Sequence, residues 1–326
     1  MSAVAELERK VGGTEVTLST TLRSGFVAPE GYVLASIDYS SQELYVAAVL
    51  SGDQTMLQAF KSPEKLPLLD ADNNPIVKDG QAVYYKNPDA DLHTITAQGC
   101  CYPELFRNQP KHEWVGIAKD ASLISAKGSA RDAAKRVNFG ICYGQTAQAM
   151  TNLYHVPLAL TEEWLKRHKE TYPDFHRFAH DVGILSETRG WSLNKDGRLR
   201  WVAEDNAKAA GASPARSGVN FQIQGYSATQ AKLAMKYVFE AFQGTAARLG
   251  MMIHDELVCI VPGKLTLVPD KCKIENGVLI PIYEPNAEAH QWAKLCQDLM
   301  EKAQAETFDH IWPGRAEASV AKYWSK

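Results

Sequence analysis

The sequence of 326 residues lacks the features that define several classes of protein. It contains no apolar run approaching the roughly 18 residues that a membrane-spanning helix needs. Its first ten residues, MSAVAELERK, hold no apolar signal-peptide region. Its 6 cysteines include no C-x-x-C pair, which argues against a zinc ribbon or a disulfide framework. We therefore expect no membrane partner and a reducing compartment, which means the cytoplasm.

The chain also lacks the excess of basic residues that most nucleic-acid-binding domains carry, since 35 Lys+Arg face 38 Asp+Glu and the net charge is −3. The average hides an uneven distribution. Residues 101–250 hold 20 Lys+Arg and 14 Asp+Glu, whereas the rest of the chain holds 15 and 24. A basic middle therefore lies between two acidic flanks, and the middle has the charge that suits phosphate groups.

The spacing of apolar residues predicts an α+β fold, in which strands from both halves of the chain combine with a helical insertion. Strands are expected at 31–37, 249–253 and 257–261, hairpins within 61–90, around 196–197 and within 264–283, and helices at 43–50, 129–139, from Thr161, at 219–242 and at 287–305. Ser40 or Ser41 would cap the first of these helices. The length suits about two domains.

The first polar cluster is the segment DYSSQEL at 38–44, in which Asp38 comes directly after the strand expected at 31–37. A carboxylate at the end of an apolar strand is unfavourable unless a cation or a hydrogen-bond donor meets it. Asp38 is therefore either a cap of the following helix or a ligand for a cation.

The second cluster is HDE at 254–256, between two apolar strands where ordinary hairpins favour Asn-Gly or Asp-Gly. Taken alone, it is either a polar turn or a functional site. Strand ends can bring Asp38 and Asp255 together, and carboxylate oxygens are the ligands that Mg²⁺ prefers. Such a pair would hold two Mg²⁺ ions about 3.5–4 Å apart, an arrangement suited to in-line phosphoryl transfer.

The third cluster is the pattern R-x3-K-x3-F-x3-Y-G at 131–144. On a helix of 3.6 residues per turn, its four side chains lie along one slowly drifting stripe. Arg131 and Lys135 would bind a triphosphate, and Phe139 and Tyr143 would contact a base or a sugar. The alternative is a solvated basic stripe whose aromatic end enters the core.

Together the three clusters resemble motifs A, B and C of the family-A DNA polymerases, which comprise the bacterial DNA polymerase I type, phage replicative enzymes and the mitochondrial replicase. DYSSQEL resembles motif A, the pattern at 131–144 motif B and HDE motif C, and their order along the chain agrees. Asp-Leu-His at 91–93 and R-x3-N-x3-Q-G at 216–225 resemble two further segments of the family. The resemblance extends from about Leu22 to the C-terminus.

The resemblance implies the palm and fingers of a right-hand polymerase, with thumb and exonuclease domains absent. The palm is an antiparallel sheet backed by helices, and the fingers are a helical subdomain inserted into it. The expected parts are an N-terminal extension at 1–21, palm at 22–45 and 202–326 with an insert at 264–283, and fingers at 46–201 with an insert at 61–90.

The activity that the resemblance implies is template-directed addition of nucleotides from dNTPs to a primer 3′-hydroxyl. Asp38 and Asp255, helped by the Tyr39 carbonyl, would ligate both Mg²⁺ ions. Glu256 would be either an auxiliary acid near the primer end or a residue with a plain structural role, and Lys135 would be a candidate general acid. The other implied contacts are to the incoming nucleotide, from Tyr39, Glu43, His93, Arg131, Lys135, Phe139 and Tyr143, and to primer and template, from Arg216, Asn220, Gln224 and His254.

The absence of a thumb bears on DNA binding, because the thumb normally grips the duplex and most duplex affinity comes from phosphate contacts and counterion release. A near-neutral chain without a thumb should bind primer-template DNA weakly. We therefore expect a second polypeptide that carries thumb and 3′–5′ exonuclease, as in a split polymerase. A truncated polypeptide is the other interpretation. The likeness to phage enzymes is compatible with a phage-encoded protein in a bacterial cytoplasm.

Two other functions stay open at this point. A single-subunit RNA polymerase shares the two aspartates and the Lys and Tyr of motif B, although Glu43 and Phe139 favour a DNA polymerase. A non-catalytic assembly subunit with the same fold would be expected to have lost a metal ligand or a triphosphate-binding cation. Both aspartates and both cations are present.

Overall fold

The computed structural model of the protein describes residues 7–11, 14–18, 25–124, 128–203, 213–275, 278–308 and 314–324. The chain divides into two compact units, each described below by itself. Unit 1 comprises Met1–Ser40 and Ala228–Lys326, and unit 2 comprises Ser41–Ser227. The sequence predicts boundaries at 45/46 and 201/202, whereas the units change at 40/41 and 227/228. The assignment of palm and fingers stays a prediction.

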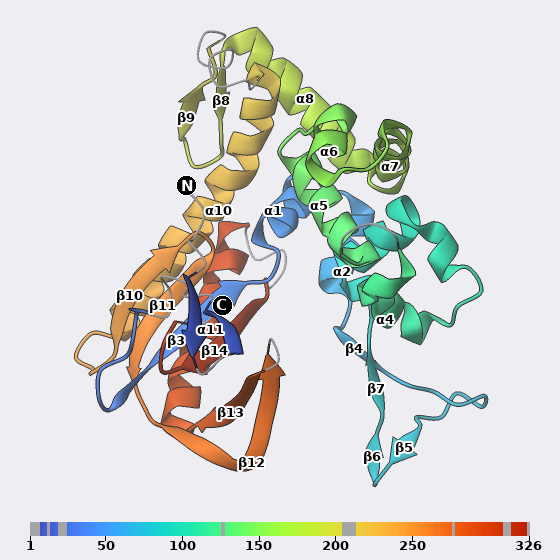
Figure 1. The fold of residues 1–326 in the computed structure, drawn as a ribbon. Coiled ribbons are helices and arrows are strands. Elements are labelled where there is room, and N and C mark those ends of the chain that lie inside the picture. The colour runs from blue at the N-terminus through green and yellow to red at the C-terminus, as the bar shows by residue number, and fades with distance from the viewer. Residues whose placement is uncertain are drawn as a thin grey trace. The chain divides into compact units, whose positions relative to one another are not determined.

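Unit 1 is built on a sheet that has, in the part of the chain that the structure describes, four antiparallel strands in the order β10-β11-β3-β14 (Figure 1). Their bounds are Tyr32–Tyr39 for β3, Arg248–Ile253 for β10, Glu256–Pro262 for β11 and Ala316–Ala321 for β14. The strands predicted at 31–37, 249–253 and 257–261 are confirmed. A strand from near the start of the chain thus lies between two strands from near its end.

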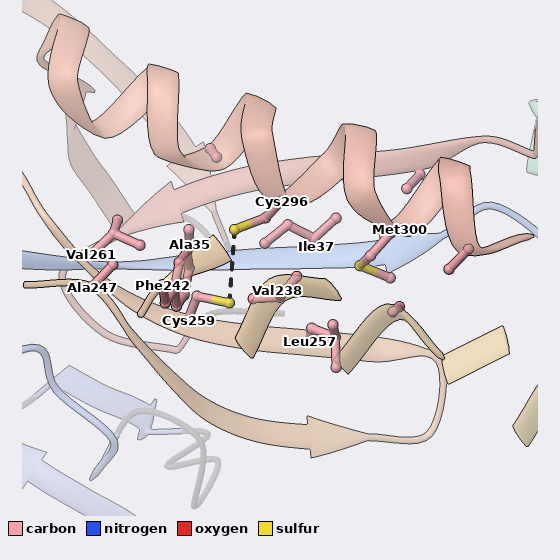
Figure 2. Close-up of a cluster of buried hydrophobic side chains, with 14 of the residues drawn as sticks. Ala35, Ile37, Val238, Phe242, Ala247, Leu257, Cys259, Val261, Cys296 and Met300 are labelled. Atoms are coloured by element: carbon pink, nitrogen blue, oxygen red, sulfur yellow. Dashed lines mark hydrogen bonds between the residues drawn. The ribbon is translucent and has the colours of Figure 1, made fainter. Parts of the chain in front are cut away.

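The core of unit 1 lies on one face of this sheet. Alternate residues of β3 point into it, because side chains along a strand alternate between the two faces. They are Val33, Ala35, Ile37 and Tyr39. Helix α11 (Ala287–Thr307) confirms the helix predicted at 287–305 and buries residues spaced three or four apart, namely Ala289, Ala293, Cys296, Met300 and Ala303. Figure 2 shows Cys296 and Met300 facing the sheet, with the sulfur atoms of Cys259 and Cys296 4.0 Å apart.

Two further hairpins belong to unit 1. Near the N-terminus, β1 (Leu7–Val11) pairs with β2 (Thr14–Leu18) within the predicted extension 1–21. β12 (Leu265–Glu275) pairs with β13 (Val278–Pro285), so the hairpin predicted within 264–283 is confirmed.

Unit 2 is mainly helical. Its larger helices are α1 (Gln42–Ser51), α2 (Gln54–Lys61), α3 (Leu92–Thr96), α4 (Trp114–Lys119), α5 (Ala130–Cys142), α6 (Ala147–Tyr154), α7 (Leu158–Thr171), α8 (Pro173–Arg189) and the first half of α10 (Pro214–Ala241). Single helical turns lie at Pro88–Ala90, Ala97–Cys101, Pro103–Phe106, Lys111–Glu113 and Ala121–Leu123. Across the described residues of both units, no helix is long and apolar enough to cross a membrane.

Three short hairpin pairings complete unit 2 and confirm the predictions for 61–90 and 196–197. Strand β4 (Lys65–Pro67) pairs with β7 (Tyr84–Lys86), and β5 (Val77–Lys78) with β6 (Gln81–Ala82), so that 61–90 contains a projecting arm. Strand β8 (Trp191–Leu193) pairs with β9 (Leu199–Trp201) around Asp196–Gly197.

One predicted helix start and one predicted side-chain cap are wrong. Helix α7 begins at Leu158, directly after Pro157, and Thr161 lies inside it with its hydroxyl donating to the Leu158 carbonyl at 2.9 Å. Ser41 is at the N-cap position of α1, but its side chain makes no capping hydrogen bond. The reason is the left-handed backbone of Ser41 (φ 56°), since a capping serine needs an extended one. Asp38 lies within β3 and is not the cap of α1 either.

Truncation of Met300 tests the core of unit 1, because its side chain is fully buried between α11 and the sheet. We expect Met300→Ala to lower the free energy of unfolding by about 2–5 kcal/mol, the usual cost of lost contacts plus a cavity. The measurement is urea denaturation. Met252→Ala, at a position 38% exposed on β10, is the matched control and should change stability far less. Equal effects would contradict the described core.

Candidate active site

Two carboxylates of unit 1 lie at the same end of neighbouring strands. In the β3–β11 pairing Glu256 is directly opposite Asp38, and Asp255 precedes Glu256 in the turn. The Tyr39 amide donates to the Asp255 carbonyl at 3.2 Å, so the two backbones are in contact here. Asp38 alternates with Ile37 and Tyr39, which face the core, and its side chain therefore lies on the other face. The sequence argument that strand ends would bring Asp38 and Asp255 together is supported by this register.

The turn that carries Asp255 has an unusual backbone. Only His254 and Asp255 separate the paired residues Ile253 and Glu256, so this is a two-residue hairpin turn. His254 is exposed and adopts the left-handed conformation (φ 60°), which in such turns is normally taken by Gly, Asn or Asp. A non-glycine residue in this region costs of order 1 kcal/mol, and such strain collects at functional sites. This backbone agrees with the prediction that the turn is a functional site.

Glu256 is held by a residue that the sequence did not indicate. Its side chain is only 4% exposed, and its Oε1 accepts a hydrogen bond from the Trp324 indole Nε1–H at 3.0 Å. Trp324 packs with Ala28, Leu34 and Val258 on the face of the sheet opposite the main core, and its ring meets Phe26 edge-on at 5.8 Å. Trp324 therefore fixes the carboxyl group next to Asp255.

The side chain of Tyr39 points away from the predicted metal site. Its side chain is buried in the core, where its hydroxyl donates to the Met300 carbonyl at 2.8 Å. Burial, and then the charge of Glu301, raise the pKa of Tyr39 far above its usual range. The predicted contact of Tyr39 with the nucleotide therefore cannot involve its side chain. The Tyr39 carbonyl remains a predicted metal ligand.

In unit 2, helix α5 presents the third cluster along one pocket. Ser129 and Asp132 form a reciprocal capping box at its start, which confirms the helix predicted at 129–139. A pocket of about 420 Å³ is lined by Asp132, Lys135, Arg136, Phe139, Gly140, Tyr143, Gln145 and Tyr154. Three of the four residues of the predicted stripe thus share one cavity, and the alternative of an aromatic end buried in the core is wrong for Tyr143, which is 36% exposed.

Arg131, the fourth residue of the stripe, is paired with Asp91 of the Asp-Leu-His segment. Its Nε and Nη2 donate to the two Asp91 oxygens at 2.7 and 3.1 Å. Burial alone would raise the pKa of Asp91, but the hydrogen bonds and charge of Arg131 outweigh it and hold that pKa below its ordinary value. This ion pair places Arg131 beside His93, so both predicted triphosphate contacts belong to one cluster.

His93 is buried and neutral near pH 7. Burial, and then the nearby charge of Arg131, lower its pKa to about 4, while Asp91 opposes the shift. Its ring lies 6.0 Å from that of Phe139, measured between centroids. His93 can therefore act as a neutral hydrogen-bonding group in this cluster, and not as a cation.

Glu43 and Tyr143 are joined by a short hydrogen bond within unit 2. The Tyr143 hydroxyl donates to Glu43 Oε2 at 2.5 Å, and Glu43 is 8% exposed. Burial, and then the Glu43 carboxyl, raise the pKa of Tyr143 well above its usual range. Two residues 100 positions apart, which the sequence placed in separate motifs, thus hold each other in place.

The segment at 216–225 lies on α10, and its first residue contacts the end of α5. The Arg216 side chain packs against Gly144: a Cβ atom added to Gly144 would lie only 2.5 Å from Arg216 Cγ. Arg216 Nη1 also donates to the Gly144 carbonyl at 3.4 Å. Because Gly144 is also left-handed (φ 68°), only glycine fits there. Gln224 opposes the larger rise in the pKa of Tyr143 that burial and Glu43 cause, and Asn220 Oδ1 is buried. Arg216 therefore supports the end of α5, and contact with DNA stays a prediction for Arg216, Asn220, Gln224 and His254.

The model of the family described as DNA polymerase family A matches residues 13–268. The chain belongs to DNA polymerase family A. The matched range includes the carboxylates of unit 1 and the α5 pocket of unit 2, so the family named from the three motifs is confirmed. The matched range begins before Leu22 and ends at residue 268, whereas the resemblance in the motifs extends from about Leu22 to the C-terminus.

Relatives of this family-A chain include bacterial and phage polymerases. The thermostable DNA polymerase I of Thermus thermophilus is 29% identical over 247 residues, which are 75% of this chain and 24% of that protein. The DNA polymerase of Mycobacterium phage D29 is 29% identical over 244 residues, 75% of this chain and 31% of that protein. The chain therefore spans about a quarter to a third of the length of these relatives.

A solved structure shares the fold of the family-A chain. The POL domain of Pol1 from M. smegmatis, in complex with DNA primer-template and dNTP, matches with a TM-score of 0.61 over 93% of this chain and 42% of that one. Sequence identity is 19%, so the likeness concerns the fold alone. It confirms the predicted α+β polymerase fold.

Loss of the indole donor tests the support of Glu256. We expect Trp324→Phe to lower the free energy of unfolding by about 1–3 kcal/mol, because it leaves a buried carboxyl oxygen without this donor while keeping an aromatic ring. Thermal and urea unfolding measure the effect. Trp201→Phe is the control, since Trp201 is 68% exposed. If the two variants lost the same stability, the Trp324 hydrogen bond would have no energetic role.

The low pKa of His93 predicts acid lability. Above pH 6.5 both folded and unfolded His93 are neutral; below it the unfolded side chain takes up a proton, whereas the folded one does so only near pH 4. Stability is therefore full at pH 7 and falls as pH is lowered, with His93 contributing about 1–2 kcal/mol of the loss between pH 7 and pH 5. Burial is the largest cause of the low pKa of His93; the charges of Arg131 and Lys135 lower that pKa further, and those of Asp91 and Asp132 oppose the shift.

Urea denaturation at pH 7 and pH 5 measures this contribution of His93 to the free energy of unfolding. In His93→Gln the difference in unfolding free energy between the two pH values should shrink by about that amount. His290→Gln, on the exposed side of α11, serves as the control. An undiminished difference in His93→Gln would contradict the assigned pKa.

Proposed function

We propose that the chain carries out template-directed DNA synthesis, adding nucleotides from dNTPs to the 3′-hydroxyl of a primer. The observation that carries this proposal is the strand register that brings Asp38 and Asp255 to one end of β3 and β11. Membership of the polymerase family supports it, and so does the α5 pocket with its lysine and aromatic rings.

The donor set of unit 1 fits Mg²⁺. Asp38, Asp255 and the Tyr39 carbonyl offer hard oxygen atoms, and no cluster of three metal-binding side chains occurs among the described residues. Ligands from the substrate phosphates would complete the coordination, as is usual for Mg²⁺ in phosphoryl transfer. When bound, two Mg²⁺ ions would activate the primer hydroxyl and stabilise the charge of the leaving pyrophosphate.

The residues of unit 2 would bind and orient the incoming nucleotide. Lys135 is exposed at the pocket and would bind the triphosphate, and its ammonium group could protonate the leaving pyrophosphate. Arg131 and His93 would hold the phosphates from the adjoining cluster. Phe139 would stack near the sugar and base. Tyr143, which lines the same pocket, would pack at the templating position.

Selection against ribonucleotides would come from Glu43. Its carboxyl group is buried and held by the Tyr143 hydroxyl, so it cannot swing aside to admit a 2′-hydroxyl. Rejection by a fixed steric obstacle needs no specific bond to the favoured substrate. This feature favours a DNA polymerase over the RNA polymerase alternative.

Substitution of the paired carboxylates tests the proposed reaction. Asp38→Asn and Asp255→Asn should each lower primer extension by at least about 100-fold, because charge stabilisation by metal ions is worth several kcal/mol. The assay is extension of a labelled primer-template with Mg²⁺ and either dNTPs or NTPs, by this chain alone and with proteins co-purified from its native source. If adding one such protein increased primer extension, this would support the prediction of a second polypeptide.

Asp298→Asn is the matched control, because Asp298 forms a surface ion pair with Lys294 on α11. It should extend primers as the unaltered chain does. If the chain used NTPs in preference to dNTPs, the RNA polymerase alternative would be favoured. If an assembly containing the Asp255→Asn variant extended primers as well as the unaltered one, the chain would be a non-catalytic assembly subunit.

A further inference from the structure

A buried polar network within unit 2 is centred on Asn138 of α5, which is 2% exposed. Its amide nitrogen Nδ2 lies 3.1 Å from His93 Nδ1, and its oxygen Oδ1 lies 3.1 Å from His168 Nε2. The Thr96 hydroxyl donates to the same oxygen at 2.9 Å. Asn138 thus joins α3, which carries His93, to α7, which carries His168.

The network continues away from the nucleotide pocket. His168 Nδ1 lies 2.9 Å from Nε2 of His176 on α8, and the Tyr172 hydroxyl lies 2.8 Å from that of Thr96. Burial lowers the pKa of His168 well below its ordinary value and that of His176 to about 4. All three histidines are therefore neutral near pH 7, and each ring carries a single N–H.

The amide of Asn138 determines where those protons lie. Its NH₂ group can only donate, so His93 Nδ1 must accept and the ring proton of His93 is on Nε2. Its carbonyl can only accept, so His168 carries its proton on Nε2 and accepts at Nδ1 from His176. One amide orientation thus sets the tautomers of three rings.

The tautomer matters because of what Nε2 of His93 faces. Among the described residues, none forms a hydrogen bond with His93 Nε2. This atom is also not among the fully buried polar atoms that lack a partner, so a ligand can reach it. The charges of Arg131 and Lys135 act on the same ring. A phosphate oxygen accepts hydrogen bonds, so a protonated Nε2 would attract it, whereas a bare Nε2 lone pair would repel it.

We propose that Asn138 is a positioning residue that locks His93 in the Nε2–H tautomer, so that His93 offers a neutral donor to the triphosphate of the incoming nucleotide. The second half of this statement rests on the proposed function, and the first does not. His168 and His176 continue the network on the other side of the amide. Sequence reasoning missed Asn138 although the signal was there, since it is a polar residue on the buried face of α5 with Ala134 and Val137.

The first arm of the test needs no substrate. Long-range ¹H–¹⁵N correlation spectra of ¹⁵N-histidine-labelled protein at pH 7 report the tautomer of each ring, and His93→Gln identifies the His93 signals. We expect the Nε2–H pattern for His93 and for His168. The Nδ1–H pattern on His93 would overturn the proposal, whatever the polymerase assay gives.

The second arm uses Asn138→Asp, which keeps the shape of the side chain but presents only acceptors to both histidines. His93 should change to the Nδ1–H tautomer or take up a second proton, and its signals show which. The first change should raise KM for dNTPs roughly 10-fold or more with little change in kcat, as expected for loss of a hydrogen bond to a charged group. If His93 instead takes up a second proton, its positive charge should keep the affinity for dNTPs and should shift the pH dependence of KM.

Asn152→Asp is the matched control, because Asn152 lies exposed on α6. It should alter neither the His93 spectrum nor KM. Should Asn138→Asp leave both the tautomer and KM unchanged, Asn138 would not position His93. If the tautomer changes as expected but the unaltered chain neither binds nor uses dNTPs, the proposed function fails while the assignment of Asn138 stands.

Discussion

The antiparallel pairing of β3 with β11 is the constraint on which the candidate site depends. It sets Glu256 opposite Asp38 and thereby brings Asp255 to the same strand end, although 217 positions separate the two aspartates. The alternation of side chains fixes this register, because Val33, Ala35 and Ile37 must reach the core with Leu257 and Cys259. A slip of one residue would bury Asp38 and expose the core face. Hydrophobic burial on one face thus positions the charged groups on the other.

A second principle runs through unit 2, where three of the side chains with an expected role in nucleotide binding have a partner that fixes them. Glu43 is held by Tyr143, Arg131 by Asp91 and His93 by Asn138. Such contacts reduce the conformational freedom that binding would otherwise have to remove. They also show how polar groups such as Glu43, His93 and Asn138 are accommodated in the buried interior of this unit, since each of these three is hydrogen-bonded. Trp324 plays the same part for Glu256 in unit 1.

Much of the fold could be predicted from the sequence, for reasons of local pattern. Alternating or continuous apolar residues indicated β3, β10 and β11, and spacing of three and four indicated α11. The two strand-end aspartates stood out because carboxylates are unfavourable beside apolar strands. The side-chain pairings that could not be predicted have one physical cause, which is contact between residues far apart in the chain. Trp324 meets Glu256 across 68 positions and His168 meets Asn138 across 30. The position of Asn138 on the buried face of α5 is a local signal, but neither pairing leaves one. The left-handed backbone of Ser41 likewise could not be read from a serine.

The central claim is that Asp38 and Asp255 act together as the metal-binding pair of a DNA polymerase. Its most direct test is a crystal structure of the chain with primer-template DNA, a non-hydrolysable dNTP and Mn²⁺, analysed by anomalous scattering at the manganese edge. We expect manganese peaks in contact with both carboxylates and with the nucleotide phosphates. Manganese bound elsewhere, with neither aspartate in its coordination shell while nucleotide and primer are in place, would contradict the account.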